Sequence, residues 1–383
     1  MTREQRIHCA ATFLMDLTAS AGFFSFPLLL YSLGASVGTV GLVGGLRYGV
    51  YTATCLSAGK LSRRFQLGPR IATIGACVWA AAHLAIPSAG SVLSVAACGV
   101  IGSIGLAVYW PALQAWTGAE RDHRSVVARL MAFNMTWGTA LALSPYPSGR
   151  LFAWSHRAPF YVVAAGAVLA GLLVLFLRPA RHVPAAAEAA EPPLHQTKDT
   201  DRFLAVGWLG NGLGYLLVSI HREIFPKQAA SIGLGPEALG GLLFARQAAQ
   251  VVAFYLAARW QGWRCRYWWM ALGHALAAGS FAVLAFAQSI PAIASCYIVN
   301  GLVAGLVYFA SMYYSVSDPA HKERRAGFHE ATVGIGCFAG PLISGQVAEA
   351  AGMRTALWLL PAFAAVGVIT AQCLLLARRP RRS

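Results

Sequence analysis

The chain has 383 residues, of which 57% are hydrophobic and 11% are charged, and its formal net charge is +16. Together with a mean hydropathy of +0.57, this composition excludes an ordinary soluble domain and indicates a membrane protein. The eight cysteines are scattered and form no CxxC pair. They are therefore expected to pack as small buried residues rather than to bind a metal or form disulfides.

Twelve apolar segments follow one another along the chain, each near the roughly 20 residues that a helix needs to span a bilayer. In chain order they cover 8–32, 36–58, 71–88, 91–116, 125–148, 157–178, 202–226, 235–258, 267–288, 291–316, 325–350 and 354–377. Pro145, Pro147 and Pro341 interrupt the fifth and eleventh segments, where neighbouring helices can satisfy the freed carbonyls. The sequence therefore predicts an all-α membrane protein with twelve transmembrane helices.

The two halves of the sequence match at an offset of 199 residues, which relates Arg47 to Arg246. The same offset relates Phe26-Pro27 to Phe225-Pro226, Gly34 to Gly233, Lys60 to Arg259, Tyr109 to Tyr308, and Thr12, Asp16 and Ser20 to Asn211, Tyr215 and Ser219. A segment rich in Ala, Pro and charge separates the halves and is typical of a flexible linker. We therefore expect two pseudo-symmetric six-helix bundles, 1–178 and 202–383, joined by a cytoplasmic linker at 179–201.

Basic residues collect in alternate loops and at both termini, whereas the opposite loops hold only Arg150, Arg157, Lys227 and Arg354. This positive-inside asymmetry predicts that both termini are cytoplasmic. The net charge is then explained by topology and contact with anionic lipid in the bilayer, and a nucleic-acid partner is not expected. Because no small-residue cleavage site follows the first apolar segment, that segment should stay as a membrane span. The expected location is a bacterial-type inner (plasma) membrane.

Two six-helix halves of the same topology resemble the major facilitator superfamily of secondary transporters. The segment Gly59-Lys60-Leu61-Ser62-Arg63-Arg64-Phe65 is similar to that family's loop between helices 2 and 3, with Arg63 where an acidic residue is expected. Gly336, Gly340-Pro341 and Gly345 in the eleventh segment are similar to a glycine-proline pattern of the family's antiporters. The antiporters carry that pattern on helix 5, so antiport is not inferred from it. The resemblance implies a monomer that works by alternating access, and no cofactor or metal is expected.

Arg47 and Arg246 each lie near the middle of a span, where a lone guanidinium costs about 3 kcal/mol or more. Tyr51 and Gln250 follow them at i+4, on the same helix faces. The resemblance implies that these two helices face each other across a central cavity. The pair of arginines is similar to that of the superfamily's nitrate/nitrite porters, which carry one arginine on each of these helices. Two guanidiniums there would suit a carboxylate, a phosphate or a nitrate-like anion. The alternative is that each arginine only holds helices together.

Asp16 is the other ionisable group near the middle of a span, with Thr12 and Ser20 on the same helix face. Burial favours the protonated form of a carboxylate and a nearby cation favours the ionised form. Asp16 could therefore couple transport to protons, or it could be a fixed counter-ion for Arg47.

Glu330 lies next to His329, about a third of the way into the eleventh span, and the alignment of Pro145 with Pro341 places Asn134 in register with it. An acid in one half and an amide in the other is expected of a coupling or counter-ion site. The alternative is a cytoplasmic gate in which Glu330 pairs with Arg324 or Arg325.

Aromatic and polar residues at matching positions could line a cavity that accepts an organic body behind the anionic group. They are Tyr109, Tyr308, Trp137, Asn134, Asn211 and Tyr215. The cluster His221-Arg222-Glu223 near the end of the seventh span is open to two interpretations. Side chains that extend to the membrane interface are favoured over an outer gate.

No phosphate-binding loop, HExxH or GxSxG signature is present, so the chain is not expected to be an enzyme. The prediction is a secondary transporter of a small organic anion, coupled to protons. The main alternative is a proton-driven exporter of cationic or neutral drug-like compounds, with the arginines structural. A non-transporting sensor and a lipid flippase are the remaining alternatives.

Overall fold

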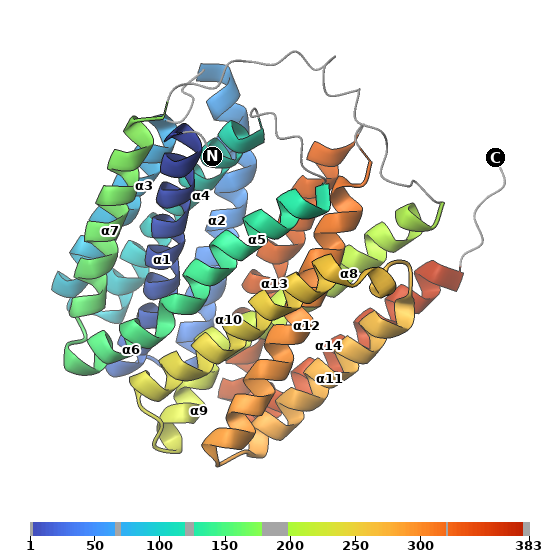
Figure 1. The fold of residues 1–383 in the computed structure, drawn as a ribbon. Coiled ribbons are helices and arrows are strands. Elements are labelled where there is room, and N and C mark those ends of the chain that lie inside the picture. Colours follow the sequence, from blue (N-terminus) through green and yellow to red (C-terminus); the bar gives the residue numbers. More distant parts are fainter. Residues whose placement is uncertain (1–2, 66–69, 119–125, 178–197, 319–320, 378–383) are drawn as a thin grey trace.

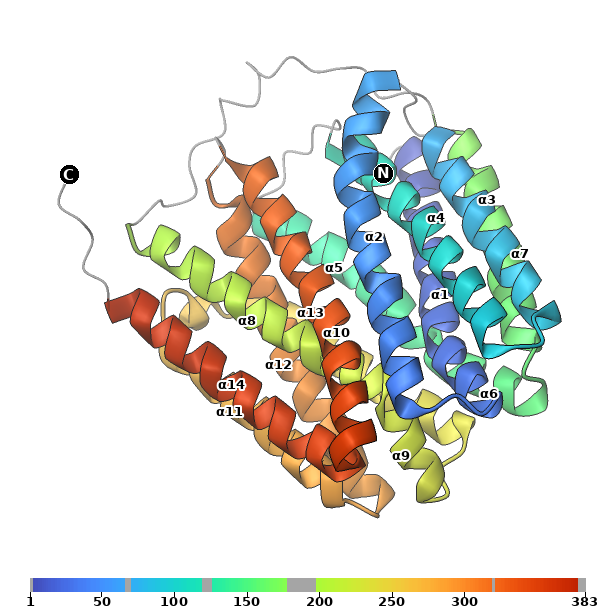
Figure 2. The same ribbon diagram turned by 180° about the vertical axis from the view of Figure 1, so that it is seen from behind.

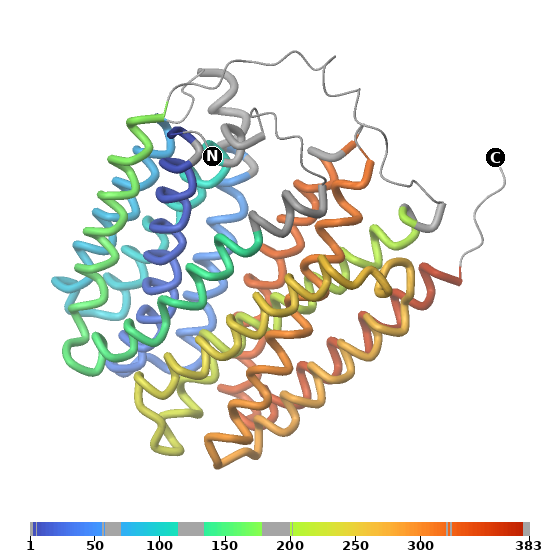
Figure 3. The backbone as a smooth tube through the Cα atoms, viewed as in Figure 1, coloured from blue at the N-terminus to red at the C-terminus, as the bar shows by residue number. Residues whose placement is uncertain are grey.

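The structure is a computed structural model that describes residues 3–65, 70–118, 126–177, 198–318 and 321–377. Within these ranges it contains fourteen α-helices, two short 3-10 helices at Ile86–Ser88 and Gln261–Trp263, and no strand (Figure 1). The helices form two bundles, one from each half of the chain, and Figure 3 follows the chain through both of them. The predicted all-α membrane architecture is therefore confirmed.

The first bundle consists of α1 (Arg3–Ser32), α2 (Val37–Phe65), α3 (Arg70–Ala85), α4 (Val92–Gly118), α5 (Val126–Leu143), α6 (Pro145–Trp154) and α7 (Ala158–Leu175). The second consists of α8 (Lys198–Glu223), α9 (Phe225–Ser231), α10 (Pro236–Arg259), α11 (Tyr267–Phe286), α12 (Ile290–Val316), α13 (Lys322–Ala351) and α14 (Met353–Ala377). Most of the predicted linker, 179–201, lies outside the described residues, and its last four residues belong to α8.

Three of the predicted spans contain a proline near a possible break, and in the structure two of them are broken while the third is continuous. The fifth ends at Leu143 and resumes as α6 at Pro145, because proline has no N–H to continue the helical hydrogen bonds. The seventh breaks at Ile224, just before Phe225-Pro226. Pro341, by contrast, lies inside an unbroken α13. The predicted loop at 59–65 is wrong, since these residues continue α2 as a helix.

The outer surfaces of the bundles are apolar, as a lipid environment requires. Large hydrophobic side chains such as Leu93 (80% exposed) and Phe363 (77% exposed) lie on the outside. Ten helical segments of the described chain are long and apolar enough to cross a membrane. Inside, a core around Trp79 joins α1, α3, α4 and α7, and a larger core fills the second bundle and reaches the first.

The turns after α1 and α9 repeat the same hydrogen bonds at the 199-residue offset. Gly34 and Gly233 have φ angles of +82° and +80°, in the left-handed region that favours glycine. In the first turn Gly34 N–H donates to Tyr31 O at 3.0 Å and Ala35 N–H to Leu30 O at 3.0 Å. In the second turn Gly233 N–H donates to Ala230 O at 3.1 Å and Leu234 N–H to Ala229 O at 2.9 Å. The sequence repeat is therefore also a structural repeat.

The two bundles meet along two matching pairs of helices. Figure 2 shows α2 beside α13, and Figure 1 shows α5 and α6 beside α10. A Cβ on Gly41 of α2 would lie 2.3 Å from Pro341 O, and a Cβ on Gly240 of α10 would lie 2.4 Å from Pro145 O. Gly41 and Gly240 are again 199 residues apart. The interface thus has the pseudo-two-fold symmetry of the sequence repeat, and glycine permits its closest contacts.

Polar contacts join the bundles at the end of the molecule where Gly34 and Gly233 lie, which we call the turn end. Glu349 Oε2 accepts a hydrogen bond from Gly38 N–H at 2.9 Å, and Gln346 Nε2 donates to Gly38 O at 3.1 Å. On the other pair of helices, Tyr146 donates to Glu237 Oε1 at 3.2 Å. The ribbons of the two bundles lie closest together at this end and diverge toward the end where α1 begins (Figures 1 and 2).

Candidate functional site

A cavity of about 70 Å³ lies between the two bundles. Helices α1, α5, α6, α8 and α10 all contribute to its wall. The lining residues are Ser20, Phe23, Phe24, Trp137, Leu141, Pro145, Tyr215, Val218, Arg222, Leu243, Arg246, Gln247 and Gln250. This wall contains two arginines and two glutamines, and it contains no carboxylate from the part of the chain that the structure describes. Its chemistry therefore favours an anionic ligand.

Arg246 is the first cation of the cavity and is only 3% exposed. Its Nη2 donates to Gln250 Oε1 at 3.2 Å, as the i+4 spacing predicts, and its Nη1 donates to Gln247 Oε1. The Nε of Arg246 has no hydrogen-bond partner among the described residues. Amide oxygens orient a guanidinium but do not neutralise it, so the positive charge stays available to a ligand.

Arg222 is the second cation of the cavity, and it is not among the residues that the sequence predicts for the site. Its guanidinium donates to the hydroxyl of Tyr48, lies 3.4 Å from Glu223 through Nε, and covers the Phe23 ring with Cζ 4.9 Å from the centroid. The favoured interpretation of 221–223 as an interfacial cluster is wrong, because His221 is 1% and Glu223 0% exposed. One feature of the sequence sets these residues apart from their counterparts in the other half. The 199-residue offset relates Arg222-Glu223 to Phe23-Phe24, so only one half carries the charges.

An aromatic group with residues from both bundles borders the cavity. Trp137 donates from Nε1 to Asn134 Oδ1 at 2.9 Å, and its ring lies 5.3 Å from Tyr308 and 5.4 Å from Phe254. Tyr215 lies 5.8 Å from Tyr308. Trp137 and Tyr215 therefore line the cavity, while Asn134 and Tyr308 hold them from behind. These four residues come together as the sequence predicts.

Arg47 is not part of this cavity, so the expected fork of Arg47 and Arg246 is not formed. The Cζ of Arg47 lies 3.9 Å from the centroid of the Phe26 ring, and its Nε and Nη1 have no hydrogen-bond partner within the described ranges. Asp16 precedes Phe26 by ten residues on α1, which is about 15 Å along a helix. It is therefore too far away to be the counter-ion of Arg47. Tyr51, one turn beyond Arg47, is half-buried and does not line the cavity.

Two other predicted residues lie within the first bundle. Asp16 is 7% exposed, and its Oδ2 has no hydrogen-bond partner in the described part of the chain. Tyr109 is fully buried and donates its hydroxyl to Ala11 O at 3.1 Å. Neither contributes to the wall of the cavity.

The predicted residues on α8 and α13 form a separate polar group. Asn211 donates to Thr332 Oγ1 at 2.9 Å, and His329 Nδ1 lies 2.9 Å from Ser311 Oγ. His329 also meets the Tyr308 ring, with centroids 4.7 Å apart. This group joins helices of the second bundle behind the aromatic wall.

Glu330 is exposed. It lies one turn before Gly334, which abuts Thr52 of α2, so it lies on the face of α13 that packs against α2. Arg325 pairs with Asp318 at 3.0 Å, and no ion pair joins Glu330 to a described residue. The alternative interpretation, a gate in which Glu330 pairs with Arg324 or Arg325, is therefore not seen among the described residues.

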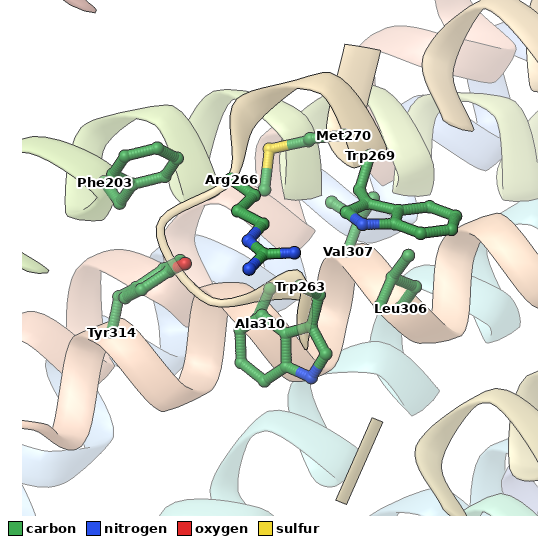
Figure 4. A pocket seen from close by; sticks show the side chains of 9 residues that line it. All are labelled: Phe203, Trp263, Arg266, Trp269, Met270, Leu306, Val307, Ala310 and Tyr314. Carbon is green, nitrogen blue, oxygen red and sulfur yellow. The ribbon is translucent and has the colours of Figure 1, made fainter. Parts of the chain in front are cut away.

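A second, smaller pocket of about 10 Å³ lies among α8, α11 and α12. Figure 4 shows Arg266 extending between the rings of Tyr314, Trp263 and Trp269 in this pocket. A single water needs about 10–15 Å³ of such space, so the pocket is too small for an organic solute. Among the described residues, no group of His, Cys, Asp or Glu could hold a metal ion.

Comparison with known proteins places this geometry in a family. The family model of the Major Facilitator Superfamily matches residues 9–327 and 207–383. A protein of Deinococcus radiodurans described as a "Putative sugar efflux transporter" is 23% identical over 291 residues, which cover 71% of this chain and 72% of that protein.

Solved structures give the same result for the fold. The nucleoside transporter NupG matches with a TM-score of 0.72 at 15% identity, over 99% of this chain and 100% of NupG. The human organic anion transporter MFSD10 matches with a TM-score of 0.69 at 16% identity, over 98% of this chain and 100% of MFSD10. The chain therefore belongs to the Major Facilitator Superfamily and is a multi-pass membrane transporter rather than an enzyme.

Proposed function

We propose that the protein is a secondary active transporter that moves a small organic anion, with a carboxylate or phosphate group, by alternating access. The observation that carries this proposal is Arg246, a buried guanidinium in the wall of the cavity between the bundles. Among the described residues, the amides of Gln247 and Gln250 accept its hydrogen bonds. A carboxylate or phosphate oxygen is the natural partner for such a group, because a charge-assisted bond would replace the hydration that burial removes. The name of MFSD10 as an organic anion transporter agrees with this chemistry.

The cavity is smaller than the roughly 300–1,000 Å³ of most organic ligand sites. We therefore expect it to widen when the bundles move against each other. The anionic group would bind Arg246, and the rest of the solute would lie against Trp137 and Tyr215. Arg47 contributes to packing at the face of Phe26 rather than to this site.

Proton coupling remains part of the proposal, with Asp16 and Glu330 as the coupling acids. Asp16 is buried with an unpartnered oxygen, among the described residues, while Glu330 is exposed. Two carboxylates in such different environments could take up and release a proton in different states of the carrier.

For the orientation we propose what the basic loops predict, with both termini in the cytoplasm and the protein in a bacterial-type inner membrane. The turn end then faces outward. A carrier whose bundles touch at the turn end and diverge at the other would be open toward the cytoplasm.

A second candidate is a neutral, polyhydroxylated solute such as a sugar. Trp137, Gln247 and Gln250 are residues that can stack on a ring and bind hydroxyls, and a distant relative is named for sugar efflux. A cationic substrate is disfavoured, because both charged residues in the described wall are arginines.

The test is binding to the purified protein, measured by thermal stabilisation with succinate, glucuronate, glucose 6-phosphate, glucose and uridine. A ligand at 100 times its dissociation constant stabilises the folded state by about 2.7 kcal/mol. Loss of a charge-assisted hydrogen bond of about 1.5–3 kcal/mol should weaken anion binding about 10- to 150-fold in Arg246→Gln. Arg354→Gln, an exposed arginine far from the cavity, is the matched control.

Stabilisation by an anion that depends on Arg246 supports the proposal. Stabilisation by glucose or uridine alone, retained in Arg246→Gln, would establish the neutral solute instead. Binding of no anion to the wild-type protein would also contradict the proposal.

A further inference from the structure

Arg222 and Glu223 lie where the two halves of the molecule meet. Their counterparts at the 199-residue offset are Phe23 and Phe24, and Arg222 covers the ring of its own counterpart, Phe23, at 4.9 Å. Two equivalent positions can touch only if they lie close to the pseudo-two-fold axis that relates the bundles. The repeat thus carries one ion pair near its axis, in one half alone.

Arg222 belongs to the cavity and to the contact between the bundles at once. It lines the cavity together with Arg246. From α8 in the second bundle, it also donates a hydrogen bond to the Tyr48 hydroxyl of α2 in the first, and its Cζ lies 5.1 Å from the centroid of the Tyr48 ring. A ligand that changes the position of this guanidinium therefore also changes a contact between the bundles.

Glu223 is a buried carboxyl group whose hydrogen-bonding capacity is unfilled among the described residues. It is 0% exposed, and its Oε1 lies 3.4 Å from Arg222 Nε. Neither carboxylate oxygen has a hydrogen-bond partner among the residues described, although a buried carboxylate normally accepts several bonds. The backbone carbonyl of Glu223 accepts from Tyr31 at 2.9 Å, which ties this position to α1. Glu223 is close to Arg222 but bound to it in a loose geometry.

We propose that Arg222 is the second anion-binding residue of the cavity and that Glu223 is the internal anion that occupies it when no solute is bound. An incoming carboxylate or phosphate binds both Arg246 and Arg222, with the two-pronged geometry that a guanidinium offers to an oxyanion. It displaces Glu223 from Arg222 toward α2, where a Cβ on Gly44 would lie 3.3 Å from Glu223 Oε2 and where Arg47, one turn further on, has unpartnered Nε and Nη1 among the described residues. This proposal rests on the proposed function, since it extends the same site to a second cation.

The exchange also links binding to movement. When the solute holds Arg222, the hydrogen bond to Tyr48 is lost, and one contact that keeps the bundles together near the turn end is lost with it. A solute thereby favours the state in which the bundles separate at that end. The empty carrier keeps Arg222 on Tyr48 and Glu223 and so resists the same movement.

The test is the affinity of four variants for succinate, glucuronate and glucose 6-phosphate, measured by titration calorimetry. Arg222→Gln should bind the anion at least about tenfold more weakly, because one charge-assisted bond is lost. Glu223→Gln and Tyr48→Phe should bind it more tightly, by about three- to tenfold, because each removes a competitor for Arg222. Tyr146→Phe removes another tyrosine hydrogen bond between the bundles without touching Arg222, and it should bind as the wild type does.

A gain in affinity is decisive, since general damage to the fold weakens binding. If Glu223→Gln does not fold, Tyr48→Phe decides the question without any change in charge. The proposal is overturned if neither Glu223→Gln nor Tyr48→Phe, where it folds, binds the anion more tightly than the wild type. It is also overturned if Arg222→Gln binds the anion as tightly as the wild type does. Binding that still depends on Arg246 in those cases leaves the proposed function intact. If none of the three anions binds the wild type, both proposals are overturned.

Discussion

At the scale of single residues, the cavity combines two kinds of wall. Arg246 and Arg222 supply charge, while Trp137 supplies a flat apolar surface whose indole nitrogen is already occupied by Asn134. A satisfied indole has no hydrogen bond to offer a ligand. Its contribution is therefore expected to come from ring contact alone, and the ring contact should select for solutes with a planar or cyclic body.

If Trp137 contributes ring contact alone, substitutions that keep or remove the ring should differ in their effect. Trp137→Phe should keep most of the affinity, and Trp137→Ala should lose about tenfold or more, since an aromatic contact contributes about 0.5–1.5 kcal/mol beyond the buried area. Binding of glucuronate and of succinate should be compared, because only glucuronate has a ring. The control is Trp154→Ala, whose side chain is 81% exposed. Equal losses for both ligands would show that Trp137 acts on the fold and not on the solute.

Some of the residues in the cavity wall can be predicted from the sequence, and others cannot. Arg246 with Gln250 was predictable, because helical spacing alone places both on one face. Arg47 looks equivalent in sequence, yet its guanidinium lies on Phe26 and outside the cavity. Which of two matched arginines faces the cavity depends on the rotation and tilt of each helix, and periodicity does not fix these. Arg222 was missed because its place near a helix end is typical of the membrane interface.

At the scale of helices, the interface between the bundles depends on glycines that face backbone. Gly41 on α2 meets the carbonyl of Pro341, and Gly240 on α10 meets the carbonyl of Pro145. Glycine has no side chain beyond its Cα, so it lets a neighbouring helix approach this closely. The repeat and the positions of the prolines can be read from the sequence. The pairing of each proline with a glycine of the other half appears only once the bundles are packed.

Substitution of these glycines should therefore separate the helices that they join. Gly41→Ala and Gly240→Ala would each place a methyl group about 2.3–2.4 Å from a backbone oxygen, so one helix must shift. We expect both variants to transport more slowly and to expose the cavity from the turn end. The measurement is the reaction of a Ser20→Cys reporter with an impermeant thiol reagent, in a protein without its native cysteines.

The matched control is Gly279→Ala, a helical glycine with open space around its Cβ position. It should react and transport as the parent protein does. The same labelling rate in all three variants would mean that the α2–α13 and α10–α6 contacts do not control access to the cavity.

At the scale of the whole molecule, the two bundles are symmetric in backbone and asymmetric in charge. The turns at Gly34 and Gly233 share their hydrogen bonds, and the glycine–proline contacts occur twice. Asp16, Glu223 and Glu330, by contrast, each occur in one half only. Because the two matching interfaces both close the turn end, the symmetry allows them to open there together. Asymmetry explains why a chemical event at one place, such as the binding of an anion, can favour one of the two states.

Alternating access predicts that a lock at the turn end stops transport without abolishing binding. A Cβ on Gly38 would lie 3.4 Å from the Cβ of Glu349, close to the separation of about 3.5–4.5 Å that a disulfide requires. Gly38→Cys with Glu349→Cys should therefore form a disulfide on mild oxidation, in a background without native cysteines. The locked protein should still bind the anion from the end where the bundles diverge, and its transport should fall to background and return on reduction. The single variants control for the loss of the Glu349 contact, and full transport by the oxidised pair would exclude separation at the turn end as a step of the cycle.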